Sequence, residues 1–493
     1  MKRSLCFFFS LLLFLACSEA SRSARTEKTP IKAPTVAAKV LPAWSPVHQF
    51  YGVYMKGQKV GWAEETIALD SDGLVKFAQQ ITMKIGRAGA VMTLDWSETA
   101  WFEAVPDGQL VKSRVNESLG TAGRVQYEGA RQGNQFQIRT VVDGNVQVNK
   151  VPIPKRRVEE VIPSLWIQRM LAAKPDEPVT THQFNYKTRR DEVMESSIVS
   201  RSKTRLHGVP VTVLEIKTVL PSDNLTMIGR GTEDGQMLEM QVGPMFRMLL
   251  EDKAVAQDIS AATPDMFASA TIQLNTPLGS APVRSLTLTV SGVPDDAIPS
   301  DGRQSVDGSV VQVFQRAHGD TPTFDLSEEK RAQYLESSAF IDHQNPTIRA
   351  LADRAKSIES PLQRVKRINA LVFRALRYTL ETAPESASAI LAMGRGDCSE
   401  YARLTVAVLR ASGFPAREVS GLAYLGDATP GLGYHAWVEV YLDGRWFPMD
   451  PTWNQVPIDA SHVALSHGSS TSFAGLVGSM KATVQSINGR VIP

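Results

Sequence analysis

Apolar and polar residues alternate through most of the first half of the chain. Stretches such as FYGVYMKGQKVGWAEETIAL and AVMTLDWSETAWFEA follow this period of two, and turn pairs such as Lys56-Gly57 and Asp143-Gly144 stand within or between such stretches. This pattern is typical of antiparallel strands joined by tight hairpins. It predicts a β-rich domain over residues 46–257, with one helix inside Val158–Lys174, and a small β-rich module over residues 258–330.

The period of the apolar residues becomes helical near Asn345. NPTIRALADRAKSIES and PLQRVKRINALVFRALRYTL carry apolar residues at helical spacing, and each begins with a capping residue before a proline, Asn345-Pro346 and Ser360-Pro361. Further alternating stretches follow these helices. Residues 331–493 are therefore predicted to form an α+β domain, so the fold class is α+β, with antiparallel β-rich domains before it.

The first seventeen residues, MKRSLCFFFSLLLFLAC, combine a basic start with an apolar run that ends at Cys17. This is the pattern of a secretory signal, and its Ala-Cys ending resembles a bacterial lipobox. We expect export, lipidation of Cys17 and an anchor in the outer membrane, on the periplasmic side or the cell surface, because Ser18 follows the cysteine. The alternative is an ordinary cleaved signal peptide. Residues 18–45, rich in Ser, Ala, Pro and Lys, are predicted to be a flexible linker.

Composition narrows the classes of partner. The 493 residues suffice for several domains, and 53 basic against 51 acidic residues leave a formal net charge of +2, which does not favour nucleic acid as a partner. The chain has three cysteines, Cys6, Cys17 and Cys398, so an exported form would keep Cys398 without a partner for a disulfide. A single thiol in an oxidising compartment is a candidate reactive group, the alternative being an inert buried cysteine.

The stretch GRGDCSEYARL places Cys398 where a helix is predicted to begin. Asp397 can cap this helix, and Glu400, three residues later, completes the pattern of a capping box. In the first turn, free amide groups and the helix dipole favour a thiolate over a thiol. Gly394 and Gly396 allow close approach of the backbone.

A hairpin is predicted around Asp443-Gly444, which separates two alternating runs in YHAWVEVYLDGRWFPMDPTW. If these two residues form the loop, the opposed pairs are Leu442 and Arg445, Val440 and Phe447, Val438 and Met449, Trp437 and Asp450, and His435 and Thr452. One face is then apolar, and the other carries His435 and Asp450 as diagonal neighbours whose side chains can meet.

Cys398, His435 and Asp450 together suit nucleophilic acyl transfer. Cys398 would attack a carbonyl, His435 would stabilise the thiolate and protonate the leaving amine, and Asp450 would orient His435. The backbone amide of Cys398 could stabilise the oxyanion. Two alternatives are a surface His435–Asp450 pair with a core cysteine, and a zinc site, although no CxxC or HxxxH motif accompanies the three residues.

These motifs resemble the transglutaminase-like core of the papain-like cysteine-enzyme superfamily, in the order Cys, His, Asp, over about residues 345–465. The stretch DPTWNQVPIDASHVALSHG is similar to the version in bacterial exported proteins, in which a histidine such as His462 follows the aspartate strand. The resemblance implies a cysteine-dependent acyl-transfer enzyme with Cys398, His435 and Asp450 as its triad, without a cofactor or metal. It leaves open cross-linking, deamidation and proteolysis.

Trp437 and Tyr434 flank His435 and are candidates to line an acyl pocket, with packing as the alternative. The expected partners are a protein or peptide substrate in the cell envelope and a membrane reached through the lipid anchor. The sequence indicates no oligomeric state and no function for residues 46–330. The alternative from another class is a non-catalytic envelope lipoprotein that uses the fold as a binding or scaffold module.

Overall fold

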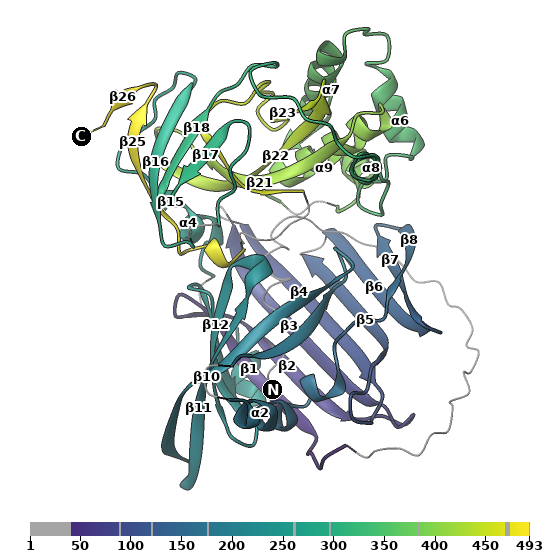
Figure 1. Ribbon diagram of the computed structural model, residues 1–493, viewed down its shortest axis with the longest axis vertical. Helices are drawn as coiled ribbons and strands as arrows, with labels where there is room; N and C mark the ends of the chain where they lie inside the picture. The colour runs from purple at the N-terminus through teal and green to yellow at the C-terminus, as the bar shows by residue number, and fades with distance from the viewer. Residues whose placement is uncertain are drawn as a thin grey trace.

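The computed structural model describes residues 41–492, apart from 88–89, 120–121, 175–176, 260–262, 295–296, 382–383 and 469–473. The predicted signal segment, Cys17 and most of the predicted linker lie outside these ranges, so the expectations about them stay predictions. Figure 1 shows one large sheet below a second half that contains most of the helices and several smaller sheets. In the described part of the chain, no helix is long and apolar enough to cross a bilayer.

The large sheet is antiparallel throughout and contains fourteen of the described strands, in the order β8-β7-β6-β5-β4-β3-β2-β1-β14-β13-β12-β11-β10-β9. Each strand therefore pairs with its neighbour in sequence, except that β1 pairs with β14 and joins two meanders, with Val53 opposite Met248. The strands are β1 (Val47–Met55), β2 (Gln58–Leu69), β3 (Val75–Arg87), β4 (Ala90–Phe102), β5 (Leu110–Leu119), β6 (Ala122–Gln132), β7 (Gln135–Val142), β8 (Asn145–Pro152), β9 (Val179–Asn185), β10 (Arg190–Leu206), β11 (Val209–Leu220), β12 (Leu225–Thr232), β13 (Met237–Val242) and β14 (Phe246–Glu251).

The hairpin turns follow from residues that tolerate a positive φ. Lys56 and Gly57 have φ values of 48° and 83°, and Asp143 and Gly144 have 48° and 87°. Two successive positive φ values are what a tight hairpin of type I′ requires, and glycine adopts the second at no steric cost. The predicted turns at these two places are therefore confirmed, and the predicted helix inside Val158–Lys174 is α2 (Pro163–Ala172), after the short η2 (Val158–Glu160).

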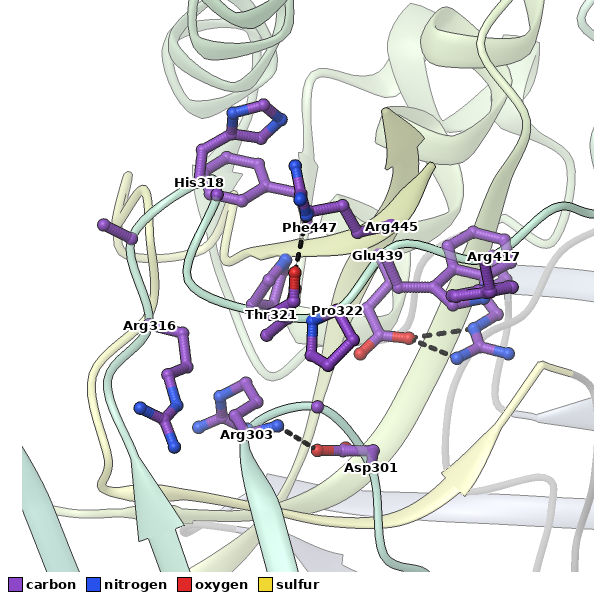
Figure 2. A pocket seen from close by; sticks show the side chains of 16 residues that line it. Asp301, Arg303, Arg316, His318, Thr321, Pro322, Arg417, Glu439, Arg445 and Phe447 are labelled. Carbon is purple, nitrogen blue, oxygen red and sulfur yellow. Dashed lines mark hydrogen bonds and ion pairs between the residues drawn. The ribbon is translucent and has the colours of Figure 1, made fainter. Parts of the chain in front are cut away.

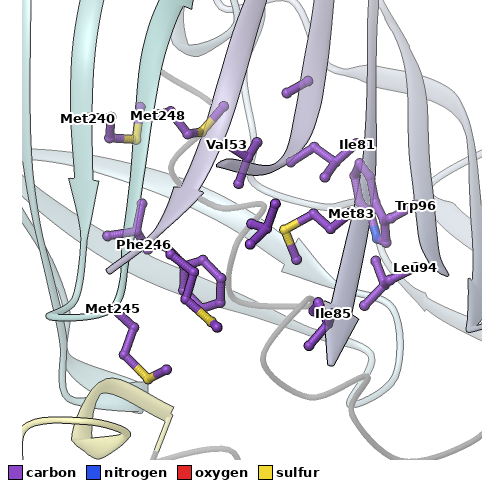
Figure 3. Close-up of a cluster of buried hydrophobic side chains, with 14 of the residues drawn as sticks. Val53, Ile81, Met83, Ile85, Leu94, Trp96, Met240, Met245, Phe246 and Met248 are labelled. Carbon is purple, nitrogen blue, oxygen red and sulfur yellow. The ribbon is translucent and has the colours of Figure 1, made fainter. Parts of the chain in front are cut away.

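One face of the large sheet carries a methionine-rich core (Figure 3). Met83, Met240 and Met248 pack there with Val53 and Phe246 among many other buried side chains. Tyr434 and Phe340, which belong to the second half of the molecule, pack against the same cluster. Methionine fills irregular gaps because its side chain is unbranched and flexible. The two halves of the chain therefore share a continuous apolar contact.

The chain between the two halves forms short elements and a five-stranded sheet. The order of that sheet is β17-β18-β16-β25-β26, so strands from near the end of the chain complete it. Its strands are β16 (Ser285–Ser291), β17 (Gln304–Asp307), β18 (Val310–Phe314), β25 (Lys481–Ile487) and β26 (Arg490–Val491), and the short elements near it are α3 (Lys253–Gln257), α4 (Met266–Ala270) and β15 (Ile272–Gln273). The predicted small module at 258–330 therefore does not form its sheet alone, although the full division into domains stays a prediction.

The helices of the second half are α5 (Glu328–Gln333), α6 (Pro346–Asp353), α7 (Pro361–Ala375), α8 (Ala387–Met393) and α9 (Cys398–Ala411). The predicted caps of α6 and α7 are confirmed: the Asn345 side chain accepts a hydrogen bond from Thr347 N, and Ser360 accepts one from Gln363 N. The other strands here are β19 (Arg377–Tyr378), β20 (Arg395–Gly396), β21 (Ala416–Tyr424), β22 (Gly431–Leu442), β23 (Arg445–Met449) and β24 (His462–His467). The predicted α+β domain, helices first, follows the β-rich region.

Helix α9 is the centre of this domain. Its apolar residues pack with α6, α7 and α8 on one side and with the apolar face of β22 and β23 on the other, where Val438, Val440, Phe447 and Met449 are buried. Fully burying one such side chain stabilises the fold by about 1.5–3 kcal/mol. This packing fixes the start of α9 beside strand β22.

The hairpin β7–β8 of the large sheet docks beside α8. The Asp143 carboxylate accepts hydrogen bonds from the backbone N–H of Glu385 and Ser386, at 2.8 and 2.7 Å. Asn145 donates to Asp342 at 3.0 Å. The large sheet thus contacts the second half by hydrogen bonds as well as by the methionine-rich core.

Candidate active site

Cys398 is the first residue of α9, as predicted. The Asp397 side chain accepts a hydrogen bond from Ser399 N at 2.8 Å, and the Glu400 carboxylate accepts one from Asp397 N at 2.6 Å. The predicted capping box is therefore confirmed. Cys398 is partly exposed, and its sulfur lies at the end of the helix where the dipole is positive.

The hairpin β22–β23 has the predicted register for five pairs, from Leu442 opposite Arg445 to Val438 opposite Met449. The predicted ladder pairs Trp437–Asp450 and His435–Thr452 are wrong, because β23 ends at Met449 and Asp450 pairs instead with Gln455. The backbone N–H and C=O of Asp450 are hydrogen-bonded to Gln455, each at 2.9 Å, so they are not available to Trp437.

His435 and Asp450 nevertheless meet. His435 Nε2 lies 2.9 Å from Asp450 Oδ2. The other oxygen, Oδ1, accepts a hydrogen bond from Thr452 N at 2.7 Å, so both oxygens of this fully buried carboxylate are held. Because Nε2 is bonded to Asp450, Nδ1 is the ring nitrogen left for the sulfur of Cys398.

The charges around His435 favour its imidazolium form. Burial lowers the pKa of His435, but the Asp450 carboxylate and then the Cys398 sulfur raise it, with a net result of about 10. Burial raises the pKa of Asp450, but His435 and His462 lower it by more, so the pKa of this carboxyl lies well below its usual range. A protonated His435 beside Cys398 would stabilise a thiolate.

A second histidine shares Asp450. His462 Nε2 lies 3.3 Å from Asp450 Oδ2, and His462 Nδ1 lies 3.4 Å from Asp459 Oδ1. His462, which is fully buried, thus stands between two carboxylates, and Asp450 stands between two histidines. In the sequence, His462 was indicated through the resemblance alone, whereas Asp459 carried no signal.

The imidazole of His435 is covered by Trp453. The two ring centroids lie 4.5 Å apart and the planes differ by 10°, while Trp453 is 45% exposed. Trp453 was missed in the sequence, although it stands only three residues after Asp450. An aromatic side chain that closely follows a candidate triad residue is the signal that could have found it.

The two aromatic residues predicted to flank His435 lie in different surroundings. Trp437 is fully buried with Val419, Ile458 and Ala464, as a packing residue would be. A Cβ on Gly421 would lie 2.5 Å from the Trp437 ring, so this glycine makes room for it. Tyr434 is partly buried against the methionine-rich core. A contact of either residue with an acyl group stays a prediction.

The same geometry bears on metal binding. His435, Asp450 and His462 offer ligand atoms that all lie within 4.8 Å of one another, so these three could hold a metal ion. Cys398 is not part of that set. In the described residues, however, both Nε2 atoms already lie at hydrogen-bond distance from the same carboxylate oxygen, at 2.9 and 3.3 Å. Hydrogen bonds from the two imidazoles to Asp450 are therefore sufficient to explain this arrangement.

Comparisons with known proteins bear on this part of the chain. Residues 349–451 match the family model of the Transglutaminase-like superfamily. The chain is 33% identical over 132 residues to the protein-glutamine gamma-glutamyltransferase of Pseudomonas aeruginosa, a match that covers 23% of this chain and 19% of that protein. It is 29% identical over 122 residues to the kyphoscoliosis peptidase of Mus musculus, covering 22% and 18%.

The chain thus spans less than a third of the length of the curated relatives it matches. A solved structure from Brucella abortus, a β-barrel-like protein of a domain of unknown function, is 9% identical, covers 42% of this chain and 96% of its own, and has a TM-score of 0.34. That likeness is too weak to support an inference. The family match includes Cys398, His435 and Asp450. Residues 349–451 are therefore a transglutaminase-like domain, preceded in this chain by a β-rich region.

Proposed function

We propose that this protein is a cysteine-dependent acyl-transfer enzyme that acts on amides of proteins or peptides. The observation that carries the proposal is that Cys398 begins α9 beside His435. The Nε2 atom of His435 is hydrogen-bonded to the buried carboxylate of Asp450. The presence of a transglutaminase and a peptidase among the relatives supports the same chemistry.

In this proposal the Cys398 thiolate attacks the carbonyl carbon of the amide, and the oxygen takes the negative charge. The backbone N–H of Cys398, in the first turn of α9, stabilises that oxyanion. When the intermediate collapses, the C–N bond breaks and the His435 imidazolium gives its proton to the departing amine. The acyl group remains on sulfur as a thioester, and His435 is neutral.

The second half of the reaction regenerates the Cys398 thiolate. An acceptor, either a primary amine or water, gives a proton to neutral His435 while it attacks the thioester carbon. The C–S bond then breaks and the thiolate returns beside the imidazolium. Asp450 keeps Nδ1 of His435 aimed at the sulfur through both steps.

The site is proposed to work in the bacterial envelope, with Cys17 as the lipidated residue that anchors the chain. The support for this is the signal pattern and the lipobox-like Ala-Cys in the sequence. The substrate would then be an envelope protein or peptide. Metabolic labelling with a fatty-acid analogue, compared between the wild type and Cys17→Ala, tests the anchor separately from the chemistry.

The acyl-transfer proposal is tested with the purified chain, a glutamine-rich protein as donor and dansylcadaverine as amine. Amine incorporation, ammonia release and peptide cleavage are followed in parallel, and they separate cross-linking, deamidation and proteolysis. Cys398→Ala and His435→Ala should abolish all three, whereas Cys398→Ala should keep the wild-type circular dichroism. Activity that survives in folded Cys398→Ala would overturn the proposal.

The metal alternative is tested in the same assay. Dialysis against a chelator should leave the activity unchanged if His435, Asp450 and His462 are held together by hydrogen bonds and not by a metal ion. Loss of activity on chelation and its return with zinc would favour the metal centre instead. Iodoacetamide labelling of Cys398 measures the reactivity of the thiol without any substrate. His435→Ala should slow this labelling if His435 stabilises the thiolate.

A further inference from the structure

A pocket with charged side chains in its wall lies away from Cys398, between the five-stranded sheet and the hairpin β22–β23. Its volume is about 260 Å³, and none of Cys398, His435 and Asp450 lines it. Three separate parts of the chain contribute to it: the residues just before β17, the segment after β18, and the β22–β23 hairpin with Arg417 of β21. Figure 2 shows these side chains around the space.

The charged side chains of this pocket are mostly basic. Arg303, Arg316, Arg417 and Arg445 line it, against the carboxylates of Asp301 and Glu439. Four guanidinium groups against two carboxylates leave an excess of two positive charges. One pair is internal, because Arg417 donates to Glu439 Oε2 from Nε at 2.8 Å and from Nη2 at 2.6 Å.

Arg316 is the least satisfied of these arginines. Among the described residues it has no hydrogen bond and no ion pair, its Nε is buried, and its guanidinium contacts the Phe314 ring at 4.8 Å. Leaving a buried donor of a cation without a partner is costly. A counter-ion in the pocket would supply the acceptors that the described protein atoms do not.

Two further arginines lack a carboxylate partner among the described residues. Arg445 uses Nε to donate to the Thr321 carbonyl at 2.7 Å. Arg303 is 4% exposed and uses Nη2 to donate to the carbonyls of Asp459 and His462, each at 3.0 Å, while its Nε has no partner. The carboxylates of Asp301, Glu439 and Asp459 lie near Arg303 and offset part of its charge. Arg445 forms no ion pair with a carboxylate among the described residues.

Much of the remaining wall is apolar, although His318 and Thr321 also line it. Phe324, Pro322, Phe447 and Pro448 line the pocket beside the arginines. Ligand pockets combine such apolar walls with a few polar groups that orient the ligand. A guanidinium fork suits an oxyanion with two or three oxygens, because two parallel N–H groups can donate to it at once. The wall leaves room for a small apolar part of the same molecule.

We propose that this pocket binds a small organic anion through its carboxylate or phosphate group, with Arg316 and Arg445 as the main ligands and the phenylalanine and proline side chains against its apolar part. This site is separate from the proposed acyl-transfer site. It can exist whether or not Cys398 is catalytic.

Isothermal titration calorimetry of the purified full chain tests the proposal. Sodium phosphate and sodium benzoate serve as probes, with sodium chloride keeping the ionic strength constant. Saturable binding of either probe is expected, and it tells which oxyanion the pocket prefers. Arg316→Gln and Arg445→Gln should each weaken that binding by about tenfold or more, since each removes a charge-assisted hydrogen bond. The control Arg374→Gln, an exposed arginine of α7, should bind as the wild type does.

Failure of both probes to bind saturably would overturn the proposal, and so would equal binding by the wild type and Arg316→Gln.

A second measurement uses the wild type alone, so that it remains informative if a variant does not fold. Phenylglyoxal modifies arginines, and mass spectrometry locates the products. A saturating probe should protect Arg316 from the reagent and leave Arg374 reactive. Unchanged modification of Arg316 would contradict the site.

Discussion

Trp453 lies flat on the imidazole of His435, at 4.5 Å between ring centroids. Because Asp450 holds one edge of that ring, the indole and the carboxylate together restrict both its tilt and its rotation. His435 is thus positioned from two directions by residues only three apart in the sequence.

Removing the indole should loosen His435. Stacked aromatic pairs contribute about 0.5–1.5 kcal/mol beyond their buried area, so Trp453→Ala should lower kcat/KM for amine incorporation by roughly twofold to twelvefold. Trp453→Phe should restore most of the loss, because a phenyl ring can still stack. The control Phe373→Ala, another exposed aromatic, should have no effect. Equal losses in Trp453→Phe and Trp453→Ala would speak against stacking as the cause.

Asp450 faces both His435 and His462 with one carboxylate oxygen and accepts from Thr452 N with the other. In Asp450→Asn the amide would face both His435 and His462 with a donor, so we expect kcat to fall by about a hundredfold or more. Steady-state kinetics with dansylcadaverine measures the effect, and iodoacetamide labelling of Cys398 should slow in parallel. If Asp450→Asn loses activity but Cys398 is still labelled at the wild-type rate, then Asp450 does not act by supporting the thiolate.

His462 should act through Asp450. We expect His462→Gln to lower kcat by less than Asp450→Asn does, about tenfold, and to leave KM unchanged, because His462 positions a carboxylate and does not reach the substrate. The pH profile of kcat should shift as well. If His462→Gln lowers only the thermal stability, and the folded variant keeps the wild-type pH profile of kcat, then His462 contributes to packing and does not position Asp450.

The raised pKa of His435 predicts a pH-dependent contribution to stability. Its folded value is about 10, above the ordinary 6.5, so the stabilisation is fully present below about pH 6.5 and is lost as the pH rises through about 10. Urea unfolding of the wild type and His435→Gln at pH 6, 8 and 10 measures this. The difference in the free energy of unfolding should shrink with pH; a constant difference would contradict the coupling to Asp450 and Cys398.

Glu400 closes the capping box at the start of α9. Glu400→Ala should cost about 1 kcal/mol in the free energy of unfolding, since the Asp397 amide would lose its acceptor. Thermal unfolding compared with Glu359→Ala, an exposed glutamate before α7, gives the matched control. Equal melting temperatures of the two variants would argue that the box contributes nothing.

The sequence predicted the local parts of the site because local chemistry determines them. The cap of α9 depends on Asp397 and Glu400, and five pairs of the β22–β23 hairpin follow from Asp443-Gly444 alone. The predicted pairing was wrong beyond Met449, where the backbone of Asp450 bonds to Gln455 across a turn instead of pairing with Trp437. A period-two pattern carries no information about such a turn.

Longer-range relationships were not predictable in this way. The strands of the large sheet were predicted from their alternation, but the pairing of β1 with β14 joins Val53 to Met248 across almost the whole region. No residue type marks such a partner. The arginine pocket has the same origin, since Arg303, Arg316 and Arg445 are ordinary charged residues until three segments bring them together.

The place of β25 in the five-stranded sheet affects how the chain can be made and divided. Strand β16 has β18 on one side and β25 on the other, so its second edge stays open until residues 481–487 have been synthesised. Helices α5 to α9 are all synthesised before β25 is available to pair with β16. An expression fragment that begins at residue 331 would leave β25 without β16, and fragments intended to carry the candidate active site should therefore start before Ser285.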